Sequence, residues 1–275
     1  MTTSAYRLID PLSPYVALKR HFALIVQMAK RDVKKRYRGS FAGLFWSFFN
    51  PLLMLLIYSF VFGVIFKARW SAQVTGHLQY AIVLFAGLNI STMFSECANK
   101  ATTLIEENTN YVKRVVFPLE TLTWSTIAAA LFHLLIATIA LLALSLIVNH
   151  YLPWTVILFP IVIVCFLPFI AATVWLLASL GVYFRDIKQL VAIITMALMF
   201  LAPILYPKTM IPPQYQIVLY MNPLTIIAEA SQNVLLWGKP PIWSHLAAYV
   251  LVSGFLAWIT FVWFEQTRKG FADVL

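Results

Sequence analysis

Long apolar runs separated by short polar segments dominate this chain. A helix needs about 20 apolar residues to cross the hydrocarbon core of a bilayer. Charge-free runs meet or approach that length at residues 41–66, 78–95, 121–148, 151–184, 189–207 and 242–264. The pattern predicts an all-α integral membrane protein with six transmembrane helices. Since six is an even number, both termini are expected on the same side.

Prolines divide some of these runs. Pro51 lies inside the first run, and Pro160 and Pro168 lie inside the fourth, so we expect kinks there. Residues 209–228 are also free of charge, but three prolines and several amide side chains interrupt them. Such punctuation breaks a spanning helix. We therefore predict two short re-entrant helices between spans 5 and 6, within 208–240.

The first 40 residues differ from the rest. From Pro14 to Lys30, apolar residues recur at helical spacing, which predicts an amphipathic helix at the membrane interface. The segment 30–38 then reads KRDVKKRYR, with six basic residues in nine. We divide the chain into a basic amphipathic N-terminal segment, 1–40, and a six-span transmembrane domain, 41–275.

The basic segment has two interpretations. It is either an anchor that orients the first span or a platform for anionic headgroups such as phosphate or pyrophosphate. The platform would consist of Arg31, Lys34, Lys35, Arg36 and Arg38.

Composition supports the membrane assignment, because 61% of residues are hydrophobic and 11% charged, against about 25% charged in soluble domains. The net charge of +10 would suggest nucleic acid in a soluble protein, but its distribution indicates orientation instead. Lys and Arg number 16 on the side of the termini and four on the other. The positive-inside rule then places both termini in the cytoplasm. No nucleic-acid partner is expected.

Several kinds of chemistry have no motif here. There is no GxxxxGK[ST] loop for ATP, no HExxH, no GxSxG and no metal-ligand cluster. His133, deep in the third span, is more typical of a helix–helix contact than of a proton relay, and Glu106 and Glu107 are expected on a solvated face. We predict no catalytic residue, metal or cofactor in this chain, and no enzyme activity. ATP and magnesium would be bound by a partner chain.

Four segments in order resemble one family. They are KRDVKKRYRGSFAGLFWSFFNPLL (30–53), NTNYVKRVVFP (108–118), YFRDI (183–187) with APILYP (202–207), and NPL (222–224). The chain resembles permease subunits of ABC transporters that export polysaccharides and polyol phosphates, such as O-antigen, capsule and teichoic acid. The family often has an arginine after NPL, where this chain reads EASQNVLL (229–236).

The resemblance implies a homodimer in the bacterial cytoplasmic (inner) membrane that pairs with two copies of a soluble ATP-binding subunit. Its substrate would be a lipid-linked polysaccharide, as in lipopolysaccharide biosynthesis, and membrane lipids would surround it. The loop 96–120 would couple to the ATPase. The coupling residues would be Glu106, Asn108, Asn110, Tyr111, Lys113 and Arg114.

Aromatic residues make up 15% of the chain and cluster in the first span. Sugar rings stack on aromatic faces, so these side chains would line a glycan path; an interfacial belt or lipid-facing bulk is equally compatible. The candidates are Phe45, Trp46, Phe49 and Tyr58.

The leading hypothesis is ATP-driven export of a lipid-pyrophosphate-linked polysaccharide, with 208–240 gating the periplasmic exit. The gate residues would be Tyr206, Tyr215, Tyr220, Asn222 and Glu229. One alternative is an ABC permease that exports a small amphiphile or lipid. Another is a membrane enzyme that acts on lipid-linked sugars.

Overall fold

The protein is helical throughout the residues that the structure describes. A computed structural model describes residues 13–37, 45–65, 77–113 and 117–275, and these ranges contain no strand. Four long helices are apolar enough to cross a membrane: α5 (His77–Ala101), α7 (Glu120–Asn149), α8 (Phe159–Tyr183) and α12 (Trp243–Thr267). Two shorter apolar helices, α4 (Trp46–Tyr58) and α9 (Ile187–Leu201), lie in the first and fifth predicted spans. The all-α fold class is confirmed, and six spans stays a prediction.

Shorter elements connect and flank these helices. The α-helices are α2 (Ser13–Arg20), α3 (Phe22–Tyr37), α6 (Thr109–Val112), α10 (Gln216–Met221), α11 (Pro223–Gln232) and α13 (Phe271–Val274). Single 3-10 turns are η3 (Glu106–Asn108), η4 (Trp154–Leu158), η5 (Lys208–Met210), η6 (Pro213–Tyr215) and η8 (Arg268–Gly270), and π-helical turns are η2 (Ser59–Ile65) and η7 (Asn233–Trp237).

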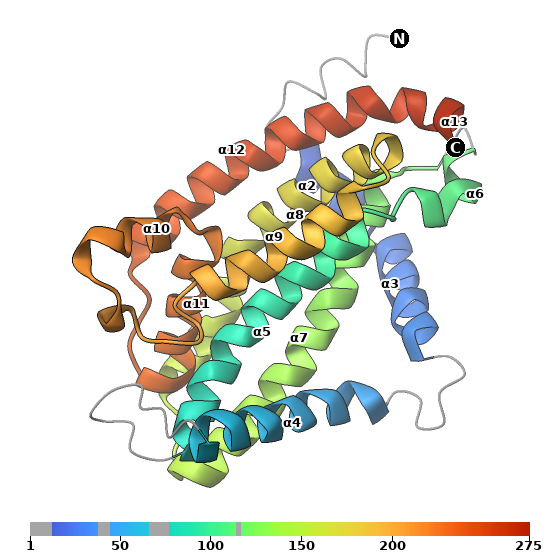
Figure 1. The fold of residues 1–275 in the computed structure, drawn as a ribbon. Helices are drawn as coiled ribbons and strands as arrows, with labels where there is room; N and C mark the ends of the chain where they lie inside the picture. The colour runs from blue at the N-terminus through green and yellow to red at the C-terminus, as the bar shows by residue number, and fades with distance from the viewer. Residues whose placement is uncertain (1–12, 38–44, 66–76, 114–116) are drawn as a thin grey trace.

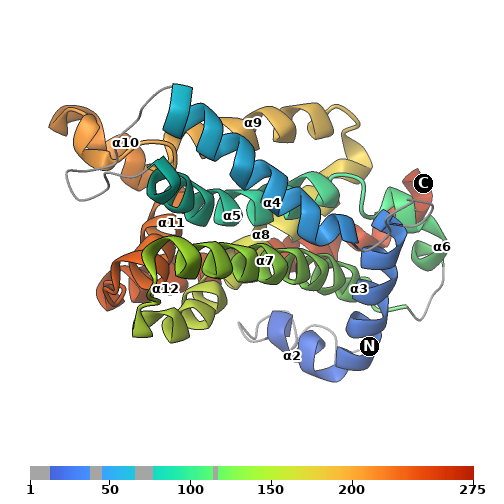
Figure 2. The same ribbon diagram turned by 90° about the horizontal axis from the view of Figure 1, so that it is seen from below.

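Helix α5 forms the centre of the bundle. It packs against α4, α7, α8, α9 and α11, and most of its residues are buried. Figure 1 shows α5 running beside α7 and α9, and Figure 2 shows α4 crossing over it. The outer helices expose large apolar side chains such as Ile193 on α9 and Leu251 on α12. Apolar outer faces of this kind are stable against lipid rather than water.

The ends of the elements follow local sequence. Pro160 is the second residue of α8, where a missing N–H breaks no helical hydrogen bond. Pro51 and Pro168 do lie inside helices. His150 ends α7 in the left-handed conformation, with φ 57°. The predicted helices of the 208–240 segment are confirmed as α10 and α11, whereas their entry into a membrane stays a prediction.

The amphipathic helix predicted from Pro14 to Lys30 is two helices that meet at His21. Much of its apolar face packs on protein rather than on lipid. The Tyr15 ring lies 6.0 Å from the Trp124 ring of α7, and Ile25 and Met28 are buried where α3 meets α7. This packing fixes the direction in which the basic end of α3 points.

Helix α3, which carries five of the chain's 20 Lys and Arg residues, lies at one end of the bundle. Helices α3, α6 and α13 lie there, and α10 lies at the opposite end (Figure 1). Helix α13 contacts α6, and its Phe271 is fully buried. The Tyr183 hydroxyl donates to the Thr267 carbonyl oxygen at 3.2 Å and ties the end of α8 to that of α12.

Candidate functional site

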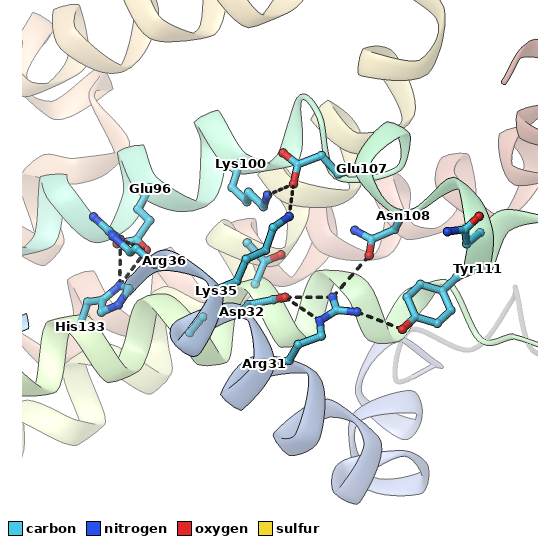
Figure 3. A pocket seen from close by; sticks show the side chains of 13 residues that line it. Arg31, Asp32, Lys35, Arg36, Glu96, Lys100, Glu107, Asn108, Tyr111 and His133 are labelled. Atoms are coloured by element: carbon cyan, nitrogen blue, oxygen red, sulfur yellow. Dashed lines mark hydrogen bonds and ion pairs between the residues drawn. The ribbon is translucent and has the colours of Figure 1, made fainter. Parts of the chain in front are cut away.

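A cavity of about 740 Å³ lies where α3 approaches the turn that follows α5. We call it the charged pocket. Its walls come from α3, α5, the η3–α6 segment and α7 (Figure 3). The lining residues are Arg31, Asp32, Lys35, Arg36, Glu96, Lys100, Glu107, Asn108, Asn110, Tyr111, Thr126, Ala129 and His133.

Helix α3 supplies four of these residues at helical spacing. Arg31 and Lys35 are four residues apart, as are Asp32 and Arg36, so all four project toward one side of the helix. Ile25 and Met28 bury another side against α7. Amphipathic packing of α3 therefore delivers its basic residues to the pocket.

Arg31 holds the outer wall. Its guanidinium donates to the Asp32 carboxylate at 2.9 Å, to the Tyr111 hydroxyl at 3.0 Å and to the Asn108 side-chain oxygen at 3.4 Å. It also lies over the Tyr111 ring, 5.7 Å from the ring centre. Partial burial alone would lower the pKa of Arg31, but the Asp32 carboxylate raises that pKa above its usual value. Arg31 therefore links α3 to α6 as a permanent cation.

Glu107 connects α3 to α5 through ion pairs with Lys35 and Lys100. Its carboxylate accepts from Lys100 at 2.5 Å, from Lys35 at 3.4 Å and from the Thr103 hydroxyl at 2.9 Å. Burial by itself would raise the pKa of Glu107, but the hydrogen bonds from Lys100 and Thr103 lower that pKa below its usual value. Glu107 is therefore a carboxylate at neutral pH, and it holds α3 to the end of α5.

The inner wall is a three-membered cluster. Glu96 Oε1 lies 2.7 Å from Arg36 Nη1 and 2.7 Å from His133 Nδ1, and Arg36 Nη1 lies 3.1 Å from the same histidine nitrogen. The Glu96 and His133 side chains are largely buried, with 23% and 16% exposed. Three helices, α3, α5 and α7, thus meet at one carboxylate (Figure 3).

A second cavity of about 360 Å³ begins at this cluster and runs between α4, α5 and α7. We call it the α4–α5–α7 crevice. Arg36, Glu96 and His133 line both cavities, so the two lie side by side there. The other lining residues are Trp46, Asn50, Pro51, Met54, Tyr58, Phe85, Leu88, Asn89, Thr92, Met93, Ala130, Leu134 and Ala137.

The predicted headgroup residues separate in the structure. Arg31, Lys35 and Arg36 line the charged pocket, whereas Lys34 is exposed and lines neither cavity. Arg38 lies outside the described residues. The aromatic candidates separate as well: Trp46 and Tyr58 line the crevice, and Phe45 stacks on Phe49 at 5.7 Å outside it.

The predicted coupling residues divide in the same way. Asn108, Asn110 and Tyr111 face the charged pocket, whereas Glu106 and Lys113 are exposed outside it. Arg114 lies outside the described residues. The basic N-terminal segment and the coupling loop were predicted as two separate sites, but residues of both line the charged pocket.

The predicted gate residues lie far from both cavities along the chain. Asn222 is buried, accepts from the Leu224 N–H at 2.9 Å and donates to the Leu198 carbonyl oxygen at 2.7 Å, which caps α11. Glu229 pairs with Lys208 at 3.2 Å. The Tyr206 hydroxyl donates to the Phe200 carbonyl oxygen at 2.8 Å. Tyr215 and Tyr220 are exposed.

Seven pocket residues were not among the predicted site residues, and five of them are ionisable: Asp32, Glu96, Lys100, Glu107 and His133. Glu107 was expected on a solvated face, and its side chain is 37% exposed, but it also forms ion pairs with two lysines. The helix–helix contact expected of His133 is confirmed by Glu96. The sequence signal for these acids was the density of positive charge in residues 30–38. Six basic residues in nine repel one another, and nearby acidic side chains offset that repulsion. Within the described ranges, no group of three His, Cys, Asp or Glu side chains is placed to hold a metal ion.

Comparison with known proteins assigns the fold to a family. Residues 23–236 match the model of the ABC-2 type transporter family. The O-antigen export system permease protein RfbA of Myxococcus xanthus is 28% identical over 258 residues, covering 93% of this chain and 96% of the relative. An RfbA of Klebsiella pneumoniae is 26% identical, covering 92% and 95%. The polysialic acid transport protein KpsM of Escherichia coli is 27% identical, covering 82% and 87%. Most of the chain matches the family model, and the chain belongs to the ABC-2 type transporter membrane family.

Proposed function

We propose that this chain is the membrane-spanning subunit of an ATP-driven exporter of lipid-pyrophosphate-linked polysaccharide, with both termini in the bacterial cytoplasm. The observation that carries the proposal is the charged pocket, which lies next to a crevice lined in part by aromatic rings. Relatives named for O-antigen export and polysialic acid transport support the same substrate class. The transport unit would be a homodimer, and two ATP-binding subunits would supply the energy that this chain does not.

The charges of the pocket suggest how a headgroup would bind. Arg31, Lys35, Arg36 and Lys100 face the carboxylates Asp32, Glu96 and Glu107. A pyrophosphate carries more negative charge than one carboxylate and offers more acceptor oxygens, so it would replace carboxylate partners of the basic residues. The carboxylates would then hold the basic side chains in place between transport cycles.

The contacts of Arg31 supply a route for coupling. We assign ATPase docking to the exposed part of the η3–α6 segment, where Glu106 and Lys113 lie. Asn108 and Tyr111 in the same segment bind Arg31 of α3. A shift of the η3–α6 segment on ATP hydrolysis would therefore move α3 and change the charged pocket. Segment 208–240 would gate the opposite exit.

The test removes pocket charges one at a time. Arg36→Gln and Lys35→Gln should each lower glycan export about tenfold or more, because hydrogen bonds to a charged group contribute about 1.5–3 kcal/mol. Export would be measured as cell-surface glycan by immunoblotting, with membrane insertion and co-purification of the ATPase checked in parallel. Lys30→Gln is the matched control, since Lys30 is an exposed base on α3 that lines neither cavity.

Export at the wild-type level in both pocket variants would contradict the headgroup role. So would an equal loss in Lys30→Gln, because that result would indicate a general effect of positive charge on the membrane surface.

A further inference from the structure

The α4–α5–α7 crevice lies next to the charged pocket, and three residues line both. A ligand whose anionic group lies at Arg36 has its next chemical group at the mouth of the crevice, because Arg36 and the two side chains it contacts line both cavities. The lining of the crevice therefore indicates what is attached to that anionic group.

Asn89 is the most informative residue in this lining. It lies on α5 seven residues before Glu96, which is two helical turns or about 10 Å deeper. Its side chain is 8% exposed, and its amide nitrogen Nδ2 is buried with no hydrogen-bond partner among the described residues. A buried donor without a partner costs about 1–3 kcal/mol, so a ligand oxygen at this position would bind favourably.

The rest of the lining mixes two kinds of side chain. The rings of Trp46, Tyr58 and Phe85 lie in the same crevice as polar Asn50 and Thr92. A sugar ring fits this mixture, because its apolar face stacks on aromatic rings while its hydroxyl and acyl oxygens form hydrogen bonds. A prenyl or acyl chain would leave the Asn89 donor buried without a partner.

We propose that the crevice binds the sugar residue adjacent to the anionic headgroup, and that the Asn89 amide donates to an oxygen of that sugar. The proposal rests on the proposed function, since it takes the pyrophosphate to lie at Arg36. Asn89 would then be a binding residue that recognises the sugar at the lipid-linked end of the glycan.

The test compares two probes on the full chain in lipid nanodiscs by microscale thermophoresis. Farnesyl pyrophosphate carries the anion and an apolar chain, and farnesyl-pyrophosphoryl-N-acetylglucosamine adds one sugar. The wild-type chain should bind the sugar-bearing probe about fivefold to tenfold more tightly, which corresponds to one hydrogen bond. Asn89→Leu and Asn89→Ala should abolish this difference and leave farnesyl pyrophosphate binding unchanged.

Ser91→Ala is the matched control. The Ser91 hydroxyl is also buried on α5 with no partner among the described residues, but Ser91 does not line the crevice. This variant should keep the difference between the probes.

Equal binding of both probes by the wild-type chain would overturn the sugar site. Tighter binding of farnesyl pyrophosphate by Asn89→Leu would also overturn it, because the crevice would then hold the prenyl chain. In either case, weaker binding of both probes by Arg36→Gln would leave the proposed function standing. Binding of neither probe by the wild-type chain would instead contradict the headgroup role itself.

Discussion

Each basic residue of the charged pocket has an acidic partner from within the chain. Arg31 pairs with Asp32, Arg36 with Glu96, and Lys35 and Lys100 share Glu107. Like charges on one helix repel each other, and these carboxylates offset that repulsion. The pairing also means that an anionic ligand competes with carboxylates for the same donors. Affinity for the ligand therefore depends on the acids as much as on the bases.

At the residue scale, Glu107→Gln should lower the thermal unfolding midpoint of the purified chain at pH 7 by no more than a few degrees. The reason is that the Glu107 side chain is 37% exposed, and ion pairs at such sites contribute about 0–1 kcal/mol. The measurement is a thermal unfolding scan in detergent at several pH values.

The expected pH dependence follows from the lowered pKa of Glu107. A lowered pKa in the folded state gives stability above the unfolded value of about 4.3, and that stability is lost as pH falls through the folded value. The difference in unfolding midpoint between the wild-type chain and Glu107→Gln should be largest at pH 7 and should vanish in strong acid. Glu106→Gln is the control, because Glu106 is exposed outside the pocket. A difference in unfolding midpoint that widens as the pH falls would contradict the lowered pKa of Glu107.

At the element scale, the pocket depends on how closely α8 approaches the turn after α5. A Cβ atom on Gly181 of α8 would lie 2.1 Å from the Thr102 carbonyl oxygen. Leu104 and Ile105 in this turn are almost fully buried, so the turn cannot move away without losing packing. Only glycine permits this approach.

Gly181→Ala should therefore destabilise the protein by about 1–3 kcal/mol, the usual cost of overpacking. It should also weaken ATPase co-purification, since the turn leads into the η3–α6 segment that we assign to docking. Gly254→Ala is the matched control, because a Cβ there meets no atom within 4 Å. Thermal unfolding and pull-down measure both effects. Wild-type stability in Gly181→Ala would show that the helix and turn separate at little cost.

How far the sequence predicts this molecule varies with the element. Charge-free runs located the long helices, with ends that differ by up to about eight residues, because lipid-facing and buried surfaces are both apolar. The break at His21 escaped prediction. The position of Pro160 at a helix start also escaped, although proline in the first turn of a helix is a local signal. The meeting of Arg36 with Glu96 and His133 also escaped, since its partners lie 60 and 97 residues away. Local periodicity carries no information at that range.

At the scale of the whole molecule, the distribution of Lys and Arg along the chain agrees with the arrangement of the helices. Helices α3, α6 and α13, which lie in segments predicted to be cytoplasmic, gather at one end, and α10 lies at the other (Figure 1). The 16 Lys and Arg assigned to one side and the four assigned to the other predict that the end with α3 is the cytoplasmic one. The pocket would then receive its ligand from the cytoplasm, where lipid-linked precursors and ATP are both present.

Cysteine labelling in whole cells tests this orientation. The native Cys97 is buried and Cys165 half-buried, so both are replaced by alanine before single cysteines are introduced. Lys239→Cys should react with a membrane-impermeant maleimide in cells whose outer membrane alone is permeabilised, because exposed Lys239 lies on the predicted periplasmic side. Lys188→Cys, equally exposed, should react only after the inner membrane is opened. The reverse pattern would place the charged pocket outside the cell, and an exporter could not then load its substrate there. Because both positions replace an exposed lysine, a difference in labelling reports the side of the membrane and not burial.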